Sequence, residues 1–204
     1  MATEINNSAI ISSGQELISK GKFDEAVEKL QEIDISTANH YYFLLLGKAY
    51  HAKGELERAV SILEQGVGQH TSISELVQRR NEYQSHVNKV EKAIELITNG
   101  QHTTPEINFA KSNTGQLIEN NCFETALKQL SDLARARKAK TTNILWIGNY
   151  LKDLYFHPNA EHLKGEFDDL LFEEMLFYYL KACKLFEPEY KVIQAAKKAL
   201  KENS

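Results

Sequence analysis

A period of 33 or 34 residues constrains the fold of this chain more than any other feature. Alanine recurs at steps of 33, 34 and 33 residues, and the apolar residue four positions later keeps the same register. A third column of small or short polar residues has steps of 33, 34, 33 and 34. The columns are Ala26, Ala59, Ala93 and Ala126; Leu30, Leu63, Ile97 and Leu130; and Gly14, Gly47, Asn81, Thr114 and Gly148. Repeats of this length form arrays in which each unit buries its apolar face against its neighbours.

Between these columns, apolar residues recur every three or four positions, which is the pattern of amphipathic helices. The sequence therefore predicts an all-α protein. Gly47 lies within an apolar helical run, where glycine costs about 1 kcal/mol relative to alanine. We expect it where the two antiparallel helices of one unit approach closely, opposite Ala59. Gly54 is expected to take a positive φ and to end the first helix of that unit.

The second unit carries the most specific motif. The pattern F-x2-L-G-x2-Y at residues 43–50, followed by A-x3-L at residues 59–63, resembles the tetratricopeptide repeat pattern W-x2-L-G-x2-Y…A-x3-F. The resemblance covers about residues 7–156, and Asn81 and Thr114 stand where the third and fourth units should have glycine. It implies a right-handed superhelix, an α-solenoid of about five antiparallel helix pairs whose first helices line a concave groove.

Past Phe156 the repeat register ends. Residues 157–165 contain breakers at Pro158 and Gly165 and predict a loop, and a helix is expected from Asp168 to Phe186. That helix is apolar around most of its circumference, so it must be covered on two sides. Either it is the displaced second helix of the fifth unit, or it forms a dimer or partner surface around Phe172, Phe177 and Tyr178.

After Pro188, an apolar stripe with lysines opposite predicts the end-cap helix that repeat arrays need. The expected domain organisation is therefore a repeat array over residues 1–156 and a helical extension with a cap over residues 157–204. The two parts are expected to pack together as one domain.

Charge and composition narrow the classes of partner. The net charge of −4 disfavours a dedicated nucleic-acid binder, and no apolar stretch is long enough for a membrane span. We expect a soluble, cytoplasmic protein with no nucleic-acid or membrane partner. Cys122 and Cys183 are the only cysteines, which is too few for a disulfide framework or a zinc ligand set. Both are interpreted as packing residues.

We find no catalytic or nucleotide-binding motif, so the chain is predicted not to be an enzyme and to need no cofactor or metal. His157 and His162 flank a proline loop, and they are interpreted as loop residues rather than metal ligands. The basic run at residues 135–140, RARKAK, is either the cationic end of a second helix or a site for an acidic peptide or phosphate.

The resemblance also implies partner-facing positions on each first helix. They are Tyr41, Leu44, Lys48 and His51 in the second unit; Glu75, Gln78, Glu82 and Ser85 in the third; Asn108, Lys111 and Ile118 in the fourth; and Leu145, Asn149 and Lys152 in the fifth. Such a mixed apolar and polar surface suits an extended or helical peptide. The clamp for acidic chaperone tails needs five basic or amide positions, of which only Arg79 matches, so that ligand is not expected.

The sequence thus predicts a non-catalytic scaffold or adaptor that binds a protein or peptide in its groove. Two alternatives stay open. The chain could be the N-terminal accessory domain of a larger enzyme, such as a glycosyltransferase or sulfotransferase, or a small repeat chaperone for a secreted substrate. A homodimer through residues 168–186 is a further expectation.

Overall fold

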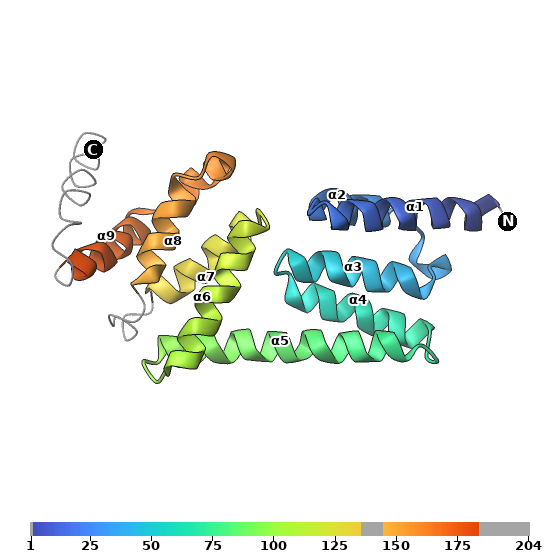
Figure 1. Cartoon of the computed structure of the whole chain (residues 1–204), viewed down its shortest axis with the longest axis horizontal. Coiled ribbons are helices and arrows are strands. Elements are labelled where there is room, and N and C mark those ends of the chain that lie inside the picture. Colours follow the sequence, from blue (N-terminus) through green and yellow to red (C-terminus); the bar gives the residue numbers. More distant parts are fainter. Residues whose placement is uncertain (1, 136–144, 184–204) are drawn as a thin grey trace. The chain divides into compact units, whose positions relative to one another are not determined.

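The computed structural model describes residues 2–135 and 145–183, and every regular element in these residues is helical (Figure 1). The all-α prediction is confirmed. The α-helices are α1 (Ala2–Ser19), α2 (Phe23–Leu30), α3 (His40–Ala52), α4 (Leu56–Gln69), α5 (Ser74–Thr98), α6 (Thr104–Glu119), α7 (Phe123–Arg135), α8 (Trp146–Tyr155) and α9 (Asp169–Cys183). Two 3-10 helices, Ile35–Thr37 and Pro158–Glu166, connect some of them.

The chain forms two compact units, residues 1–90 and 91–204, each with its own apolar core. The boundary falls inside α5, which contributes Leu76, Tyr83 and Val87 to the first core and Ile97 to the second. Division of the chain into an array and a C-terminal extension at residue 156 stays a prediction.

The turns inside the helix pairs share one geometry. Gly21 between α1 and α2 has φ +73°, Gly54 between α3 and α4 has φ +74°, and Asn121 between α6 and α7 has φ +58°. The amide after each of them donates to a carbonyl five residues back, at 3.0, 2.9 and 2.8 Å respectively. This bond satisfies a carbonyl at the helix end that would otherwise be unpaired. The expected role of Gly54 is confirmed.

The third unit differs from the prediction, because one continuous helix replaces the expected pair. In the repeat register, Asn88 is the equivalent of Gly21, Gly54 and Asn121, yet it lies within α5. The stretch from residue 84 to residue 92 contains no glycine or proline, so no residue there interrupts the helical ladder. The expectation of a helix pair in every unit is therefore wrong for the third.

The small-residue column marks close approaches between paired helices. A Cβ atom added at Gly47 would lie 2.9 Å from Leu63 Cγ, and one at Gly14 would lie 2.7 Å from Leu30 Cγ. The nearest atoms to Gly47 thus belong to Leu63 rather than to Ala59, although Ala59 is fully buried. Thr114 takes the glycine position in α6 and is also fully buried, and its hydroxyl donates to the Ala110 carbonyl at 2.9 Å.

The helix α9 packs as the displaced partner of α8. A Cβ atom added at Gly148 would lie 2.8 Å from Tyr178 Cβ, which repeats the glycine contact of the earlier pairs. The kinked 3-10 helix Pro158–Glu166 occupies the stretch in which a regular fifth unit would place its second helix. Tyr178 is fully buried, so it is not part of a free dimer surface, whereas Phe177 is 36% exposed. The expected helix end at Phe186 and the expected cap after Pro188 lie outside the described residues.

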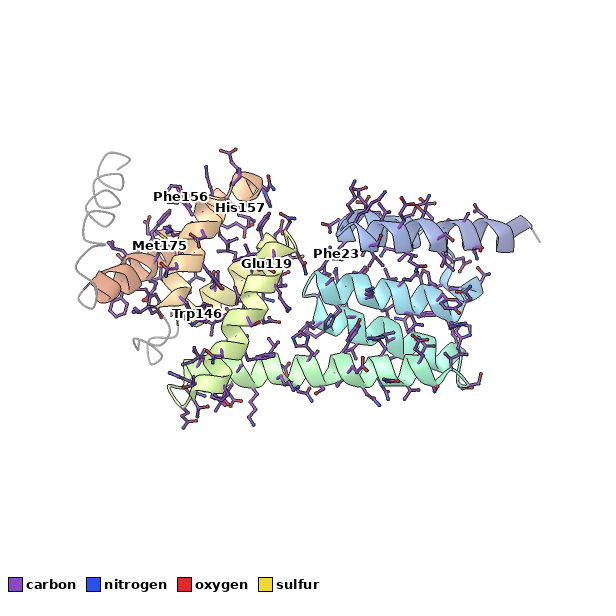
Figure 2. The ribbon with its side chains drawn as sticks, in the orientation of Figure 1. Phe23, Glu119, Trp146, Phe156, His157 and Met175 are labelled. Atoms are coloured by element: carbon purple, nitrogen blue, oxygen red, sulfur yellow. The ribbon has the colours of Figure 1, made fainter. Side chains whose placement is uncertain are left out.

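Side chains of α8 and α9 fill the core of the second unit (Figure 2). Trp146 at the start of α8 is 7% exposed and Met175 on α9 is 8% exposed. Phe156, which follows the last residue of α8, is 71% exposed and is the most exposed large apolar side chain among the described residues. The only tryptophan of the chain therefore reports on the core of this unit.

Candidate partner-binding surface

The helix α3 has one packed face and one open face. Tyr42, Phe43, Leu46, Gly47 and Ala49 are buried against the rest of the first unit. We call Tyr41, Leu44, Lys48 and His51 the α3 surface, since these predicted partner-binding residues recur at steps of three or four and share the other face. Tyr41 is 54% exposed, Lys48 is exposed, and Leu44 and His51 are partly buried. An open aromatic ring beside a partly covered leucine is an apolar patch that packing within the unit does not require.

His51 lies at the contact between α3 and α5. Its ring stacks on Tyr83, with centroids 3.9 Å apart and planes 14° apart, and its Nε2 lies 2.8 Å from Nδ1 of His86. Burial, then His86 and Arg79, lower the pKa of His51 to about 4. This predicted partner-binding residue is therefore a neutral contact residue between two helices at pH 7, with part of its ring open to solvent.

The predicted residues on α5 lie beside this contact. Gln78 donates to Glu82 at 3.1 Å, and Glu82 forms an ion pair with Arg79, also at 3.1 Å. A shallow hollow runs along the outer face of α5; its lining residues are Thr71, Ser72, Ser74, Val77, Gln78, Asn81, Glu82, Ser85 and Lys89. Three of the four predicted positions on α5 thus line this hollow, and the fourth, Glu75, is exposed.

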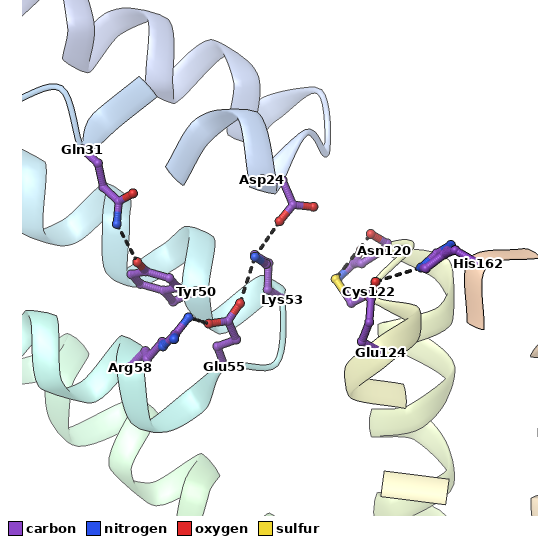
Figure 3. Close-up of polar contacts among 10 residues, drawn as sticks. All are labelled: Asp24, Gln31, Tyr50, Lys53, Glu55, Arg58, Asn120, Cys122, Glu124 and His162. Carbon is purple, nitrogen blue, oxygen red and sulfur yellow. Dashed lines mark hydrogen bonds and ion pairs between the residues drawn. The ribbon is translucent and has the colours of Figure 1, made fainter. Parts of the chain in front are cut away.

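Lys53 ties the first two helix pairs together at the open end of α3 (Figure 3). Its Nζ lies 2.5 Å from Asp24 Oδ1 and 2.8 Å from Glu55 Oε1, and Glu55 also pairs with Arg58 at 2.5 Å. Burial alone would lower the pKa of Lys53, but the two carboxylates raise it. This network holds the turns of neighbouring units in one arrangement and orients α3.

The remaining predicted residues belong to the second unit. Lys111 on α6 and Asn149 on α8 are exposed, and Lys152 on α8 is partly buried with its Nζ 3.5 Å from Asp153 Oδ1. The other predicted positions there are Asn108, which is exposed, and Ile118 and Leu145, which are partly buried. Site assignments in this unit stay predictions.

Histidines and cysteines of the described part have ordinary structural partners. His157 Nδ1 accepts from the Asn159 amide at 3.2 Å, and His162 Nε2 lies 2.9 Å from Glu124 Oε1 (Figure 3). Cys122 is buried, as expected of a packing residue. Within residues 2–135 and 145–183, no three histidine, cysteine, aspartate or glutamate side chains group closely enough to hold a metal ion.

The basic run is described only at its first residue. Arg135 ends α7, and its guanidinium lies 2.6 Å from Asp168 Oδ2. Residues 136–140 lie outside the described part, so both interpretations of the run stay predictions.

Sequence reasoning missed Tyr83, His86 and Arg79 as neighbours of His51. His86 lies 35 residues after His51, which is one repeat plus one position. A search for residues at equivalent repeat positions does not pair them. A search for histidines one repeat apart on the packed faces of neighbouring first helices would have found the pair.

The chain matches no protein-family model and no curated protein. Among the helices described, none combines the length and the apolar character that crossing a bilayer requires.

Proposed function

We propose that this chain is a non-catalytic protein-interaction module of the tetratricopeptide type, acting in the cytoplasm, that binds a peptide or a partner protein through the α3 surface. The observation that carries the proposal is the exposed Tyr41 beside Leu44 and Lys48, on the face of α3 that the core does not use. The superhelical stacking of the helix pairs is part of the proposal. It is supported by the 33- or 34-residue period and by the shared turn geometry at Gly21 and Gly54.

Energetics favour this surface as the binding site. Aromatic side chains that become buried on binding are frequent hot spots, at about 2 kcal/mol or more each when truncated. Lys48 is exposed and forms no ion pair with another described residue within 4.0 Å, so it is available to an acidic group of a partner. Tyr41 would bury apolar area, and Lys48 would set the orientation of the partner by charge.

The test is capture of the partner from the native host, followed by binding measurements with the purified partner. Tyr41→Ala combined with Lys48→Glu should weaken binding at least thirtyfold, because about 2 kcal/mol is lost at the aromatic anchor alone. Helical circular dichroism and the melting temperature should stay nearly unchanged, since both side chains lie off the core.

The matched control is Phe156→Ala combined with Lys128→Glu, which removes an exposed aromatic ring and reverses an exposed lysine in the second unit. This control should bind the partner as the wild type does. A Tyr41 and Lys48 double variant that keeps its fold and its affinity would reject the α3 surface as the binding site.

A further inference from the structure

The contact between α3 and the first half of α5 contains a pair of histidines in direct contact. His51 Nε2 and His86 Nδ1 lie 2.8 Å apart, and the two ring centroids are 4.9 Å apart. At this distance one nitrogen donates a proton and the other accepts it, so at least one ring is neutral. The contact joins residues of two helices that are not adjacent in sequence.

The surroundings of the pair disfavour added positive charge. Facing His51 from α5 are His86, the phenol ring of Tyr83 and the Arg79 guanidinium, which lies 6.0 Å from the centre of that ring. Glu82 pairs with Arg79 at 3.1 Å and balances that cation. On its own helix, His51 follows Lys48 by one turn, which adds a further cation nearby.

We propose that the His51–His86 pair is a proton-sensitive clasp, which holds the first half of α5 on α3 at neutral pH and loosens it at acidic pH. The inference goes beyond the proposed function, since it does not depend on what the α3 surface binds. The pair can share one added proton across its hydrogen bond. A second proton creates two imidazolium cations in contact, and their repulsion and partial burial favour separation of the helices.

The sign of the pH dependence follows from linkage. The unfolded chain binds a proton on His51 near pH 6.5, whereas burial, His86 and Arg79 lower the pKa in the native state to about 4. The unfolded state therefore binds more protons between these values, and stability falls as the pH falls through that window. From neutral pH to pH 5, the opening equilibrium should rise roughly thirtyfold, since each unit of pKa difference is a factor of ten.

His70 shows why this behaviour is specific to the pair. Its Nε2 lies 3.0 Å from the Ala38 carbonyl oxygen. A protonated His70 ring can still donate to that carbonyl, so acidification leaves its contact intact. Protonation of the accepting nitrogen in the His51–His86 pair removes the acceptor itself.

The first test is hydrogen exchange of the α5 amides from residue 76 to residue 87 in the full chain, corrected for intrinsic rates. Wild-type protection should fall roughly thirtyfold between pH 7.5 and pH 5, because these amides lie in the half of α5 that the pair holds. His51→Phe keeps an aromatic ring on Tyr83 but cannot titrate, so its protection should be nearly independent of pH over the same range. His86→Gln should behave likewise. The matched control His162→Gln, in the second unit, should keep the wild-type pH dependence.

The second test needs no variant. Titration of the imidazole signals of the wild type by nuclear magnetic resonance should give a His51 midpoint below pH 5. A His51 midpoint at pH 6 or above, or an unchanged pH dependence of protection in both His51→Phe and His86→Gln, would overturn the clasp.

Discussion

Replacing Tyr178 by alanine should destabilise the second unit by about 3–5 kcal/mol, the largest effect that we expect from a single substitution in this protein. Tyr178 is fully buried, and its Cβ would lie 2.8 Å from a Cβ atom added at Gly148. Truncation removes the side chain that fills the closest approach of α8 and α9, so it leaves a cavity beside a glycine that cannot fill it.

Urea unfolding followed by the fluorescence of Trp146 measures this effect, because Trp146 belongs to the same core cluster as Tyr178. Tyr178→Phe is the matched control. The Tyr178 hydroxyl is buried and has no hydrogen-bond partner among the described residues. Burial, with a smaller contribution from Glu174, raises its pKa. The phenylalanine variant should therefore be as stable as the wild type or more stable by about 1 kcal/mol. An alanine variant with an unchanged midpoint would show that α9 is not the partner of α8.

The helix pairs were predictable from the sequence where a local signal accompanied the period. Gly21 and Gly54 each follow a helix and precede an acidic first turn, and both have positive φ in the structure. Glycine reaches this conformation without steric cost, so the residue type alone indicates the turn. Gly47 was predicted at a close helix approach, and the structure places Leu63 against it.

The third unit shows where this reasoning ends. Asn88 and Asn121 are the same residue type at the same repeat position, yet Asn121 has φ +58° and Asn88 continues a helix. Asparagine tolerates both conformations at a small difference in free energy. Packing of the flanking residues then decides: Cys122 and Phe123 are buried directly after the turn at Asn121, whereas Lys89 after Asn88 is exposed. Such differences in burial are not visible in the residue type at the turn.

A fixed period also could not locate the partner of α8. Leu30 follows Gly14 by 16 residues and Leu63 follows Gly47 by 16, but Tyr178 follows Gly148 by 30. The extra residues form the 3-10 helix Pro158–Glu166, whose Ala160 and Leu163 are buried. The apolar character of the 168–186 stretch did indicate a covered helix. Which helix it covers became clear only from the contact at Gly148.

The candidate site was predictable in its exposed part and not in its packed part. Tyr41 and Lys48 follow from the repeat register, because partner-facing positions are those that the core does not need. The neighbours of His51 depend on how α5 lies against α3, and that arrangement brings together residues at unequal repeat positions. Local sequence signals do not encode such a contact.

Gly66→Ala and Gly68→Ala, two residues apart on α4, should have opposite effects on stability. A Cβ atom added at Gly66 would lie 2.7 Å from Phe43 Cβ and 3.2 Å from Leu76 Cδ2, so it meets α3 and α5 together. The Cβ of Phe43 is fixed to its backbone, so relief requires a shift of a helix. Overpacking of this kind costs about 1–3 kcal/mol.

At Gly68 an added Cβ atom meets nothing within 4 Å, and the residue is exposed. Alanine is the better helix former by about 0.5–1 kcal/mol, so Gly68→Ala should be stabilising. Urea unfolding followed by circular dichroism at 222 nm measures both variants against the wild type. The pair separates the packing role of Gly66 from helix propensity, which is the same at both positions. If Gly66→Ala were as stabilising as Gly68→Ala, the close approach of α3, α4 and α5 at Phe43 would be wrong, and with it the orientation of the α3 surface.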